Sequence, residues 1–212
     1  MNETRRTGPV ALLLWGLTLG LLLTLPAAGS CRAGEQRFQE PAEMLAAAQA
    51  EARRLDPKAR LIVAAYRLGG IGGGFKEAVM VYLSPRLKGT YNCYQIGVRR
   101  GKARLLTRLR MKPPKGGIPD PRPEPALKLA RSWILAHWWR GQTEPYMDLI
   151  LRPRRPKERL PYSVRWVWVA RAISQEEDCK VYLDAVKMRC LRAVIDKAPD
   201  ATPPPAEHFK KY

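Results

Sequence analysis

Histidine, acidic residues and long apolar runs are scarce in this chain of 212 residues. The two histidines, His137 and His208, exclude a multi-histidine metal centre, and a histidine-dependent active site would have to use one of them. The acidic residues number 19 against 38 lysines and arginines, so the net charge is +19. Hydrophobic residues at 46% and charged residues at 27% exclude a disordered chain and a polytopic membrane protein. We therefore expect a strongly basic globular protein that favours anionic partners.

Sequence motifs for nucleotides, metals and catalysis are missing as well. The glycine run 69–74 is followed by Phe75 and then a strand-like run, whereas a phosphate-binding loop needs lysine followed by serine or threonine. We interpret it as a hairpin connection. The cysteines form no Cys-x-x-Cys motif and have no histidine nearby, which argues against zinc or haem. The acids form no recognisable catalytic pair, and the candidates are Asp148, Glu176, Glu177, Asp178 and Asp184. We therefore predict no enzyme activity, no catalytic residue, no metal and no cofactor.

The N-terminus has the order of an export signal. Arg5 and Arg6 precede the apolar run 10–25, and small residues follow it. The run has 16 residues, fewer than the roughly 18 to 20 that a membrane-spanning helix needs. We predict a signal peptide over residues 1–30, with an uncleaved anchor as the alternative. Either form places the rest of the chain outside the cytoplasm.

The residues before Cys31 resemble a bacterial lipobox, in which small residues precede a cysteine that receives a diacylglycerol. The stretch reads Ala28-Gly29-Ser30-Cys31. A leucine is usual at the position of Ala28, and the same small residues also suit ordinary signal-peptidase cleavage. The resemblance implies lipidation at Cys31 and a membrane-tethered protein, and ordinary cleavage implies a secreted one.

Proline divides the remaining chain into segments. Residues 112–124 and 198–212 are rich in proline, which removes amide donors and disfavours helices and central strands. We interpret the first as a linker and the second as a tail, with a further short linker over 31–40. Two structured segments remain, 41–111 and 125–197.

Each structured segment begins with a helical pattern and continues with strand-like runs. The first helix begins at Pro41 and ends before Asp56, and the second begins at Pro125 and ends near Gly141. The strand-like runs are 61–66, 78–83, 91–98 and 103–109 in the first segment, and 146–151, 162–173, 179–184 and 189–195 in the second.

The two segments also match each other by position. A shift of 86 residues places Cys93 on Cys179 and Leu105 on Leu191. We therefore predict an α+β fold of two repeated units, each one helix packed on an antiparallel sheet of three to four strands. The alternative is a single α+β domain whose halves are alike by chance.

The second segment resembles PepSY domains over residues 125–195. Its motif is the hairpin around Asp184-Ala185, preceded by the apolar strand 164–169 that matches the family's penultimate strand. Met188 stands where the family turns on a glycine. The resemblance implies an exported or cell-surface module, in some members one that restrains a protease, and it supplies no catalytic residue. The same helix-on-sheet arrangement is similar to cystatin-like folds, which also occur in tandem.

The cysteines after Cys31 leave their pairing open. Cys179 and Cys190 lie on the two arms of the predicted hairpin, and Cys93 matches Cys179 in the other segment. A disulfide of Cys179 with Cys190 or with Cys93 suits an exported protein. Buried, reduced cysteines are the alternative.

Positive charge gathers in the connections between elements. The run 99–115 is basic, and a second group forms the predicted anion-binding loop: Arg152, Arg154, Arg155, Lys157 and Arg159. Tryptophans follow the charge, and we expect most of them in the core, with an aromatic groove as the alternative. We predict an exported binding protein, lipid-anchored if Cys31 is acylated, whose partner is a protein such as a protease. The alternative partner is an anionic membrane surface, an envelope polymer or nucleic acid bound without sequence specificity.

Overall fold

Two helices and eight strands follow one another in the described part of the chain. The computed structural model describes residues 39–114, 117–139, 146–161, 163–174 and 177–197. The helices are α2 (Pro41–Leu55) and α3 (Pro123–His137). The strands are β1 (Arg60–Leu68), β2 (Phe75–Leu83), β3 (Cys93–Arg99), β4 (Lys102–Leu109), β5 (Tyr146–Pro153), β6 (Trp166–Ile173), β7 (Glu177–Asp184) and β8 (Cys190–Lys197). Both helices and all eight strand-like runs of the sequence are confirmed as elements, with ends shifted by a few residues.

The two ends of α2 show why the local sequence signals predicted the helix correctly. Pro41 occupies the first turn, where its missing amide hydrogen costs nothing. After the helix, the carboxylate of Asp56 accepts hydrogen bonds from the Lys58 amide at 2.9 Å and the Arg86 amide at 3.2 Å, and another from the Ser84 hydroxyl. The Ser84 hydrogen bond and these amides lower the pKa of Asp56. Asp56 thus ends the helix and fastens it to the loop after β2.

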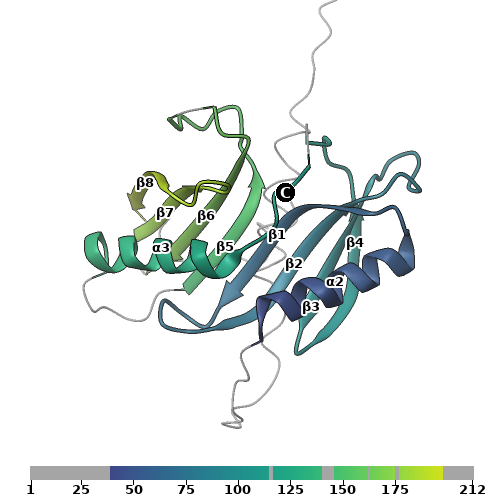
Figure 1. Cartoon of the computed structure of the whole chain (residues 1–212), viewed down its shortest axis with the longest axis horizontal. Coiled ribbons are helices and arrows are strands. Elements are labelled where there is room, and N and C mark those ends of the chain that lie inside the picture. The colour runs from purple at the N-terminus through teal and green to yellow at the C-terminus, as the bar shows by residue number, and fades with distance from the viewer. Residues whose placement is uncertain (1–38, 115–116, 140–145, 162, 175–176, 198–212) are drawn as a thin grey trace, which may run out of the picture. The chain divides into compact units, whose positions relative to one another are not determined.

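The eight strands form one antiparallel sheet in the order β4-β3-β2-β1-β5-β6-β7-β8 (Figure 1). The strands of each segment pair with their sequence neighbours. The two sets join where β1 pairs with β5, through four residue pairs that run from Ala64 opposite Leu151 to Arg67 opposite Asp148. We call this junction the β1–β5 seam.

The predicted fold class of two repeated helix-on-sheet units is therefore wrong. The protein is mostly β, with one continuous sheet and two helices in its described residues. The physical reason lies in the strands at the seam. The middle residues of β1 and β5 are buried on both faces, and an apolar strand left at the edge of a four-stranded sheet would present unpaired backbone and apolar side chains to water. Pairing β1 with β5 removes both edges.

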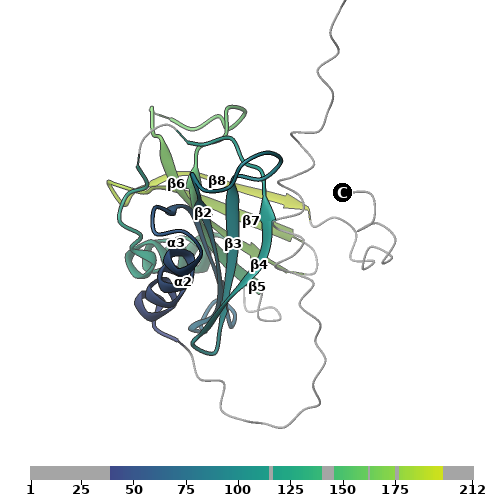
Figure 2. The ribbon, with the colours of Figure 1, turned by 90° about the vertical axis from the view of Figure 1, so that its right-hand side faces the viewer.

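Both helices cover the same face of the sheet (Figure 2). The core beneath them includes Ile134 of α3 and Val181 of β7, together with the fully buried Trp168. Tyr66 packs edge-on against Phe75, with ring centroids 5.4 Å apart, and lies 6.3 Å from the Trp168 ring. We call the opposite side of the sheet the far face.

The glycine run forms the hairpin connection between β1 and β2 that the sequence predicted. A Cβ atom on Gly73 would lie 2.7 Å from the carbonyl carbon of Gly69, so this close turn needs glycine. The Arg131 guanidinium of α3 donates a hydrogen bond to the Gly73 carbonyl and holds the hairpin against the helix.

The β7–β8 hairpin forms around Asp184-Ala185, where the sequence predicted a hairpin. Asp184 accepts hydrogen bonds from the amides of Val186 and Lys187, both at 3.0 Å. Met188 follows in the turn with a φ of 47°, a left-handed conformation that non-glycine residues rarely adopt. The sequence marked Met188 as a departure from the glycine of the family pattern and did not predict this conformation.

Candidate functional site

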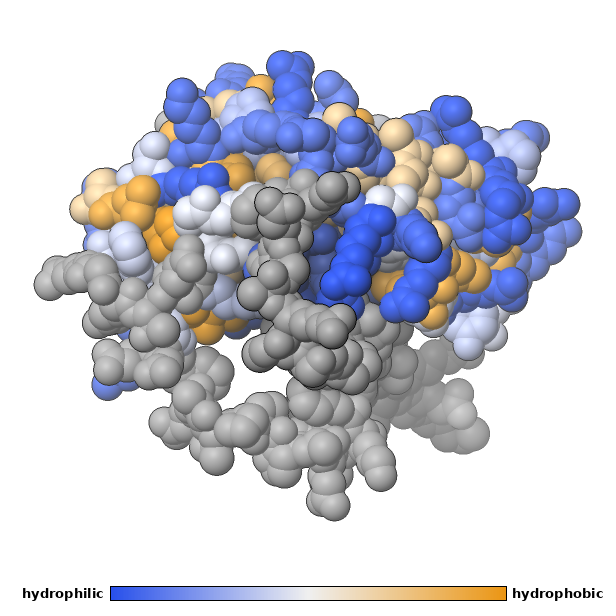
Figure 3. Space-filling view, turned by 90° about the horizontal axis from the view of Figure 1, so that it is seen from below, coloured by the Kyte–Doolittle hydropathy of each residue, from blue (hydrophilic) through white to orange (hydrophobic). Residues whose placement is uncertain are grey.

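Seven exposed cations follow one another from the end of β3 to the residues after β4. They are Arg99, Arg100, Lys102, Arg104, Arg108, Arg110 and Lys112, and we call them the basic edge. No acidic residue interrupts this stretch. Because β4 is the first strand of the sheet, it has a partner strand on one side only. The basic edge therefore follows an open margin of the sheet, and the corresponding right-hand end of the molecule is mostly hydrophilic when seen from below (Figure 3).

A tight turn gathers the first cations of the basic edge. Arg100 and Gly101 have φ values of 51° and 73°, as in the two-residue turns that suit the twist of β-hairpins. Arg99 and Lys102 are consequently paired across the hairpin. Arg99 also forms an ion pair with Glu77, with its Nε 2.9 Å from the carboxylate oxygen.

The basic edge presents charge to both sides of the sheet. Arg104 lies opposite Gly97 on the far face, whereas Arg108 lies opposite the core residue Tyr94 on the helix side. Successive residues on one side of a strand are about 6.6 Å apart. The arrangement suits an elongated anion that follows the strand.

The predicted anion-binding loop lies between β5 and β6 and is only partly available. Arg152 is 5% exposed, and its guanidinium pairs with Glu158, with one N–O distance of 3.1 Å. Arg154 donates to the carbonyls of Glu158 and Leu160 at 3.1 and 3.3 Å. These two arginines hold the loop together. The exposed members of the predicted set are Arg155, Lys157 and Arg159.

A second group of charged residues, which sequence reasoning missed, crosses the far face. In order from β3 to β8 it comprises Arg99, Glu77, Arg67, Asp148, Arg171, Asp178, Lys180 and Asp196, and we call it the charge ladder. Opposite charges on neighbouring strands stabilise a sheet by about 0.2–1 kcal/mol per pair. The members lie on seven different strands, so the sequence shows the charges but not their neighbours across the sheet.

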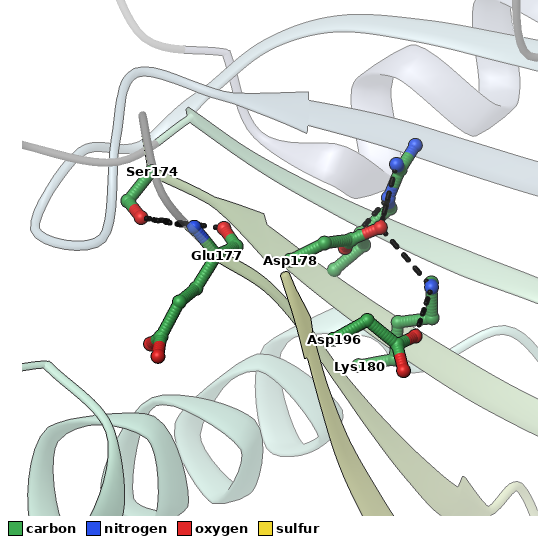
Figure 4. A network of polar contacts seen from close by, with 6 residues as sticks. Ser174, Glu177, Asp178, Lys180 and Asp196 are labelled. Carbon is green, nitrogen blue, oxygen red and sulfur yellow. Dashed lines mark hydrogen bonds and ion pairs between the residues drawn. The ribbon is translucent and has the colours of Figure 1, made fainter. Parts of the chain in front are cut away.

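The β6–β8 part of the charge ladder is fully paired. Arg171 donates to Asp178 through Nε at 2.9 Å and Nη2 at 2.7 Å. Lys180 lies between Asp178 and Asp196, at 3.1 and 3.0 Å (Figure 4). Burial by itself would raise the pKa of Asp178, but the hydrogen bond and charge of Arg171 and the ammonium of Lys180 hold it below its usual value.

The seam part of the charge ladder is poorly paired. Arg67 donates to Glu77 at 3.3 Å and lies over the Tyr146 ring, 5.1 Å from its centroid. Its Nε is 3.9 Å from Asp148 Oδ1, and that oxygen has no hydrogen-bond partner in the described part of the chain. Burial raises the pKa of Asp148 to about 6. The positive charges of Arg67 and Arg171 act to lower this pKa, and the negative charge of Glu77 acts to raise it.

The predicted disulfides do not form, since all three cysteines of the described residues are free thiols. In the β7–β8 register Cys179 lies opposite Ile195 and Cys190 lies opposite Leu183. Four positions along a strand are about 13 Å, beyond the reach of a disulfide. Cys93 and Cys179 are buried, and burial raises the pKa of each thiol to about 12. These two cysteines thus match the alternative of buried, reduced cysteines, whereas Cys190 is exposed. Cys31 lies outside the described residues.

Most tryptophans lie in the core, as expected. Trp138, Trp166 and Trp168 are buried, so the alternative of an aromatic groove on β6 is wrong. Trp133 is half-buried and stacks on the exposed His137, with ring centroids 4.8 Å apart.

Two further features are absent from the described residues. No group of three or more histidine, cysteine or acidic side chains there is placed to hold a metal ion. Neither α2 nor α3 is long and apolar enough to cross a membrane.

Comparison with known proteins leaves the chain without an assigned family. No family model matches it, and no curated protein matches it. The crystal structure of a candidate lipoprotein from Clostridium difficile 630 is similar over 76% of this chain and 97% of that chain, with 12% sequence identity and a TM-score of 0.46. At that TM-score the likeness carries no argument about fold or function.

Proposed function

We propose that the chain is an exported, non-catalytic binding protein that holds a linear anionic polymer along the basic edge. The observation that supports this function is the basic edge itself, seven exposed cations with no acidic residue among them in the sequence. Three of them, Lys102, Arg104 and Arg108, lie on the edge strand β4. Lysine or arginine on an edge strand also discourages aggregation. A few charges suffice for that purpose, and the row continues beyond both ends of β4.

A linear polymer fits the basic edge better than a flat membrane does. Arg104 and Arg108 lie on opposite sides of the sheet. A flat membrane surface that contacts one side of the sheet would therefore leave the arginine on the other side out of contact. A phosphate- or carboxylate-bearing chain can follow the strand and contact both. Guanidinium groups bind such oxyanions with two hydrogen bonds each. Nothing in the basic edge reads bases.

Export is part of the proposal and rests on the N-terminal sequence. Intact-mass measurement of the exported protein is expected to find a chain that begins at or near Cys31, with a diacylglycerol on Cys31 if the lipobox is used. The protein-binding or protease-restraining role implied by the PepSY resemblance stays a prediction, since the basic edge does not bear on it.

The experiment removes three cations from the basic edge and three from elsewhere. The edge variant carries Lys102→Ser, Arg104→Ser and Arg108→Ser. The control carries Lys157→Ser, Arg159→Ser and Arg165→Ser, which are exposed residues on the β5–β6 loop with the same total charge. Binding of long-chain polyphosphate is measured by titration at several salt concentrations.

We expect the edge variant to bind more weakly and with a flatter salt dependence, because each lost phosphate contact reduces the log–log slope by about 0.7. The control should stay close to the parent. Equal weakening of both variants would mean that net charge alone drives binding and would contradict the proposal. Stronger binding to vesicles of phosphatidylglycerol than to polyphosphate would favour the membrane alternative, and the loop set would then be the surface to test.

A further inference from the structure

The two helices leave a gap over the middle of the sheet. α2 packs on β2, β3 and β4, whereas α3 packs on β6 and β7. The central strands β1 and β5 therefore lie beneath the space between the helices, and the N-terminal ends of both helices meet there (Figure 1). The end of the proline-rich segment, which leads into α3, borders the same space.

A hollow of about 370 Å³ occupies this gap, and we call it the interhelix groove. Its apolar lining includes Leu45 and Ala46 of α2 and Pro121 before α3. Its charged lining consists of Asp120 and Glu124. The volume is near the lower end of the roughly 300–1,000 Å³ typical of ligand sites, which suits a few side chains rather than a large cofactor.

The charge of the interhelix groove is opposite to that of the protein as a whole. Lysine and arginine outnumber the acids by 38 to 19, yet the groove is lined by two acids and no base. Asp120 is paired with Arg122, whose Nε lies 3.6 Å from its carboxylate, so Glu124 is the acid that gives the groove its charge. A polyanion bound at the basic edge would be repelled here. The groove therefore calls for a different, cationic ligand.

Tyr66 adds a second polar feature on the helix side of β1. Its hydroxyl is buried and has no hydrogen-bond partner in the described part of the chain, and the residue is 1% exposed. Burial and then the charge of Glu124 raise the pKa of this phenol, so the carboxylate of the groove is close enough for its charge to act on the phenol.

We propose that the interhelix groove binds a short segment of a partner protein that carries arginine or lysine beside apolar side chains. The basic side chain pairs with Glu124, and the apolar neighbours cover Leu45, Ala46 and Pro121. This interaction goes beyond polymer binding and uses none of the residues of the basic edge.

The experiment uses the mature chain and a fluorescein-labelled, capped hexapeptide of alternating leucine and arginine as the probe, read by fluorescence anisotropy. Ala46→Trp fills the groove. Ala50→Trp is the matched control, since Ala50 is exposed one turn further along α2 and does not line the groove. Glu124→Gln removes one charge without changing shape.

We expect Ala46→Trp to weaken binding of the peptide about tenfold or more, Glu124→Gln to weaken it several-fold, and Ala50→Trp to leave it unchanged. The edge variant with serine at 102, 104 and 108 should bind the peptide as the parent does, which separates this site from the proposed polymer site. The proposal is overturned if Ala46→Trp binds like the parent, or if a peptide of alternating leucine and glutamate binds equally well.

Discussion

Among single residues, Asp148 has the most direct consequence for stability. Its pKa is raised from 3.8 to about 6 because the seam buries it and leaves one oxygen unpartnered. The folded protein therefore binds a proton on Asp148 more tightly than the unfolded chain does. The resulting contribution to stability is complete below about pH 4 and is lost as the pH rises through about 6, at a cost of at most about 3 kcal/mol at neutral pH.

The substitution Asp148→Asn is expected to raise stability at neutral and alkaline pH. The amide mimics the protonated acid, so the variant should gain about 1–3 kcal/mol over the parent at pH 8 and almost nothing at pH 4. Urea unfolding at several pH values measures the difference. A variant that is less stable than the parent at pH 8 would show that the attraction of Arg67 and Arg171 outweighs burial.

Asp178 provides the matched control on the same charge ladder. Its pKa is lowered by Arg171 and Lys180, so its contribution to stability is present at neutral pH and is lost as the pH falls through its folded value. Asp178→Asn should therefore destabilise the protein at pH 8, opposite in sign to Asp148→Asn. Equal effects of the two changes would mean that position on the ladder does not matter.

At the scale of elements, the β5–β6 loop depends on one buried ion pair. Glu158 accepts from the buried Arg152 and from the Arg155 amide at 2.9 Å. Glu158→Ala leaves the Arg152 guanidinium buried without its carboxylate and is expected to cost about 2–4 kcal/mol, measured by thermal unfolding. Lys157→Ala, an exposed neighbour, should change stability by less than about 0.5 kcal/mol. If the two changes cost the same, the pair contributes nothing.

The same loop shows where sequence reasoning about charge failed. Five bases in eight residues indicated a projecting anion site. The single acid among them, Glu158, folds inward and takes Arg152 with it. The basic edge contains no acid of its own, and its cations stay exposed, although Arg99 pairs with Glu77 of the neighbouring strand. The ion pair with Glu158 is therefore the reason that Arg152 is buried and stabilises the loop instead of binding an external anion.

For the whole molecule, the β1–β5 seam makes the two halves interdependent. Expressed separately, residues 39–114 and 117–197 should each fail to unfold cooperatively, because each would expose an apolar edge strand at β1 or β5. Thermal denaturation followed by circular dichroism tests this. Mixing the two pieces should restore a cooperative transition.

The full chain serves as the reference for this experiment and should unfold in one transition. A half that melts cooperatively on its own would show that the seam joins two independent units. In that case the interhelix groove would be a contact between units rather than part of one core.

The amino-acid sequence by itself determined the local structure. Proline at the helix starts, apolar spacing within the helices and alternation in the strands placed all ten elements, since these signals act over a few residues. The core position of most tryptophans followed for the same reason. The left-handed φ of Met188 was not predicted, because a methionine gives no local signal for that conformation.

Tertiary structure alone decided which strands meet, and with that the fold class and the sites. Similarity between the halves indicated two units, but the middle residues of β1 and β5 are buried on both faces and the two strands pair with each other. The more exposed β4 and β8 remain at the edges. Pairing between residues some 80 positions apart leaves no periodic trace in either strand. The burial of Asp148, the separation of the cysteines and the groove between α2 and α3 all follow from that pairing and the register it sets.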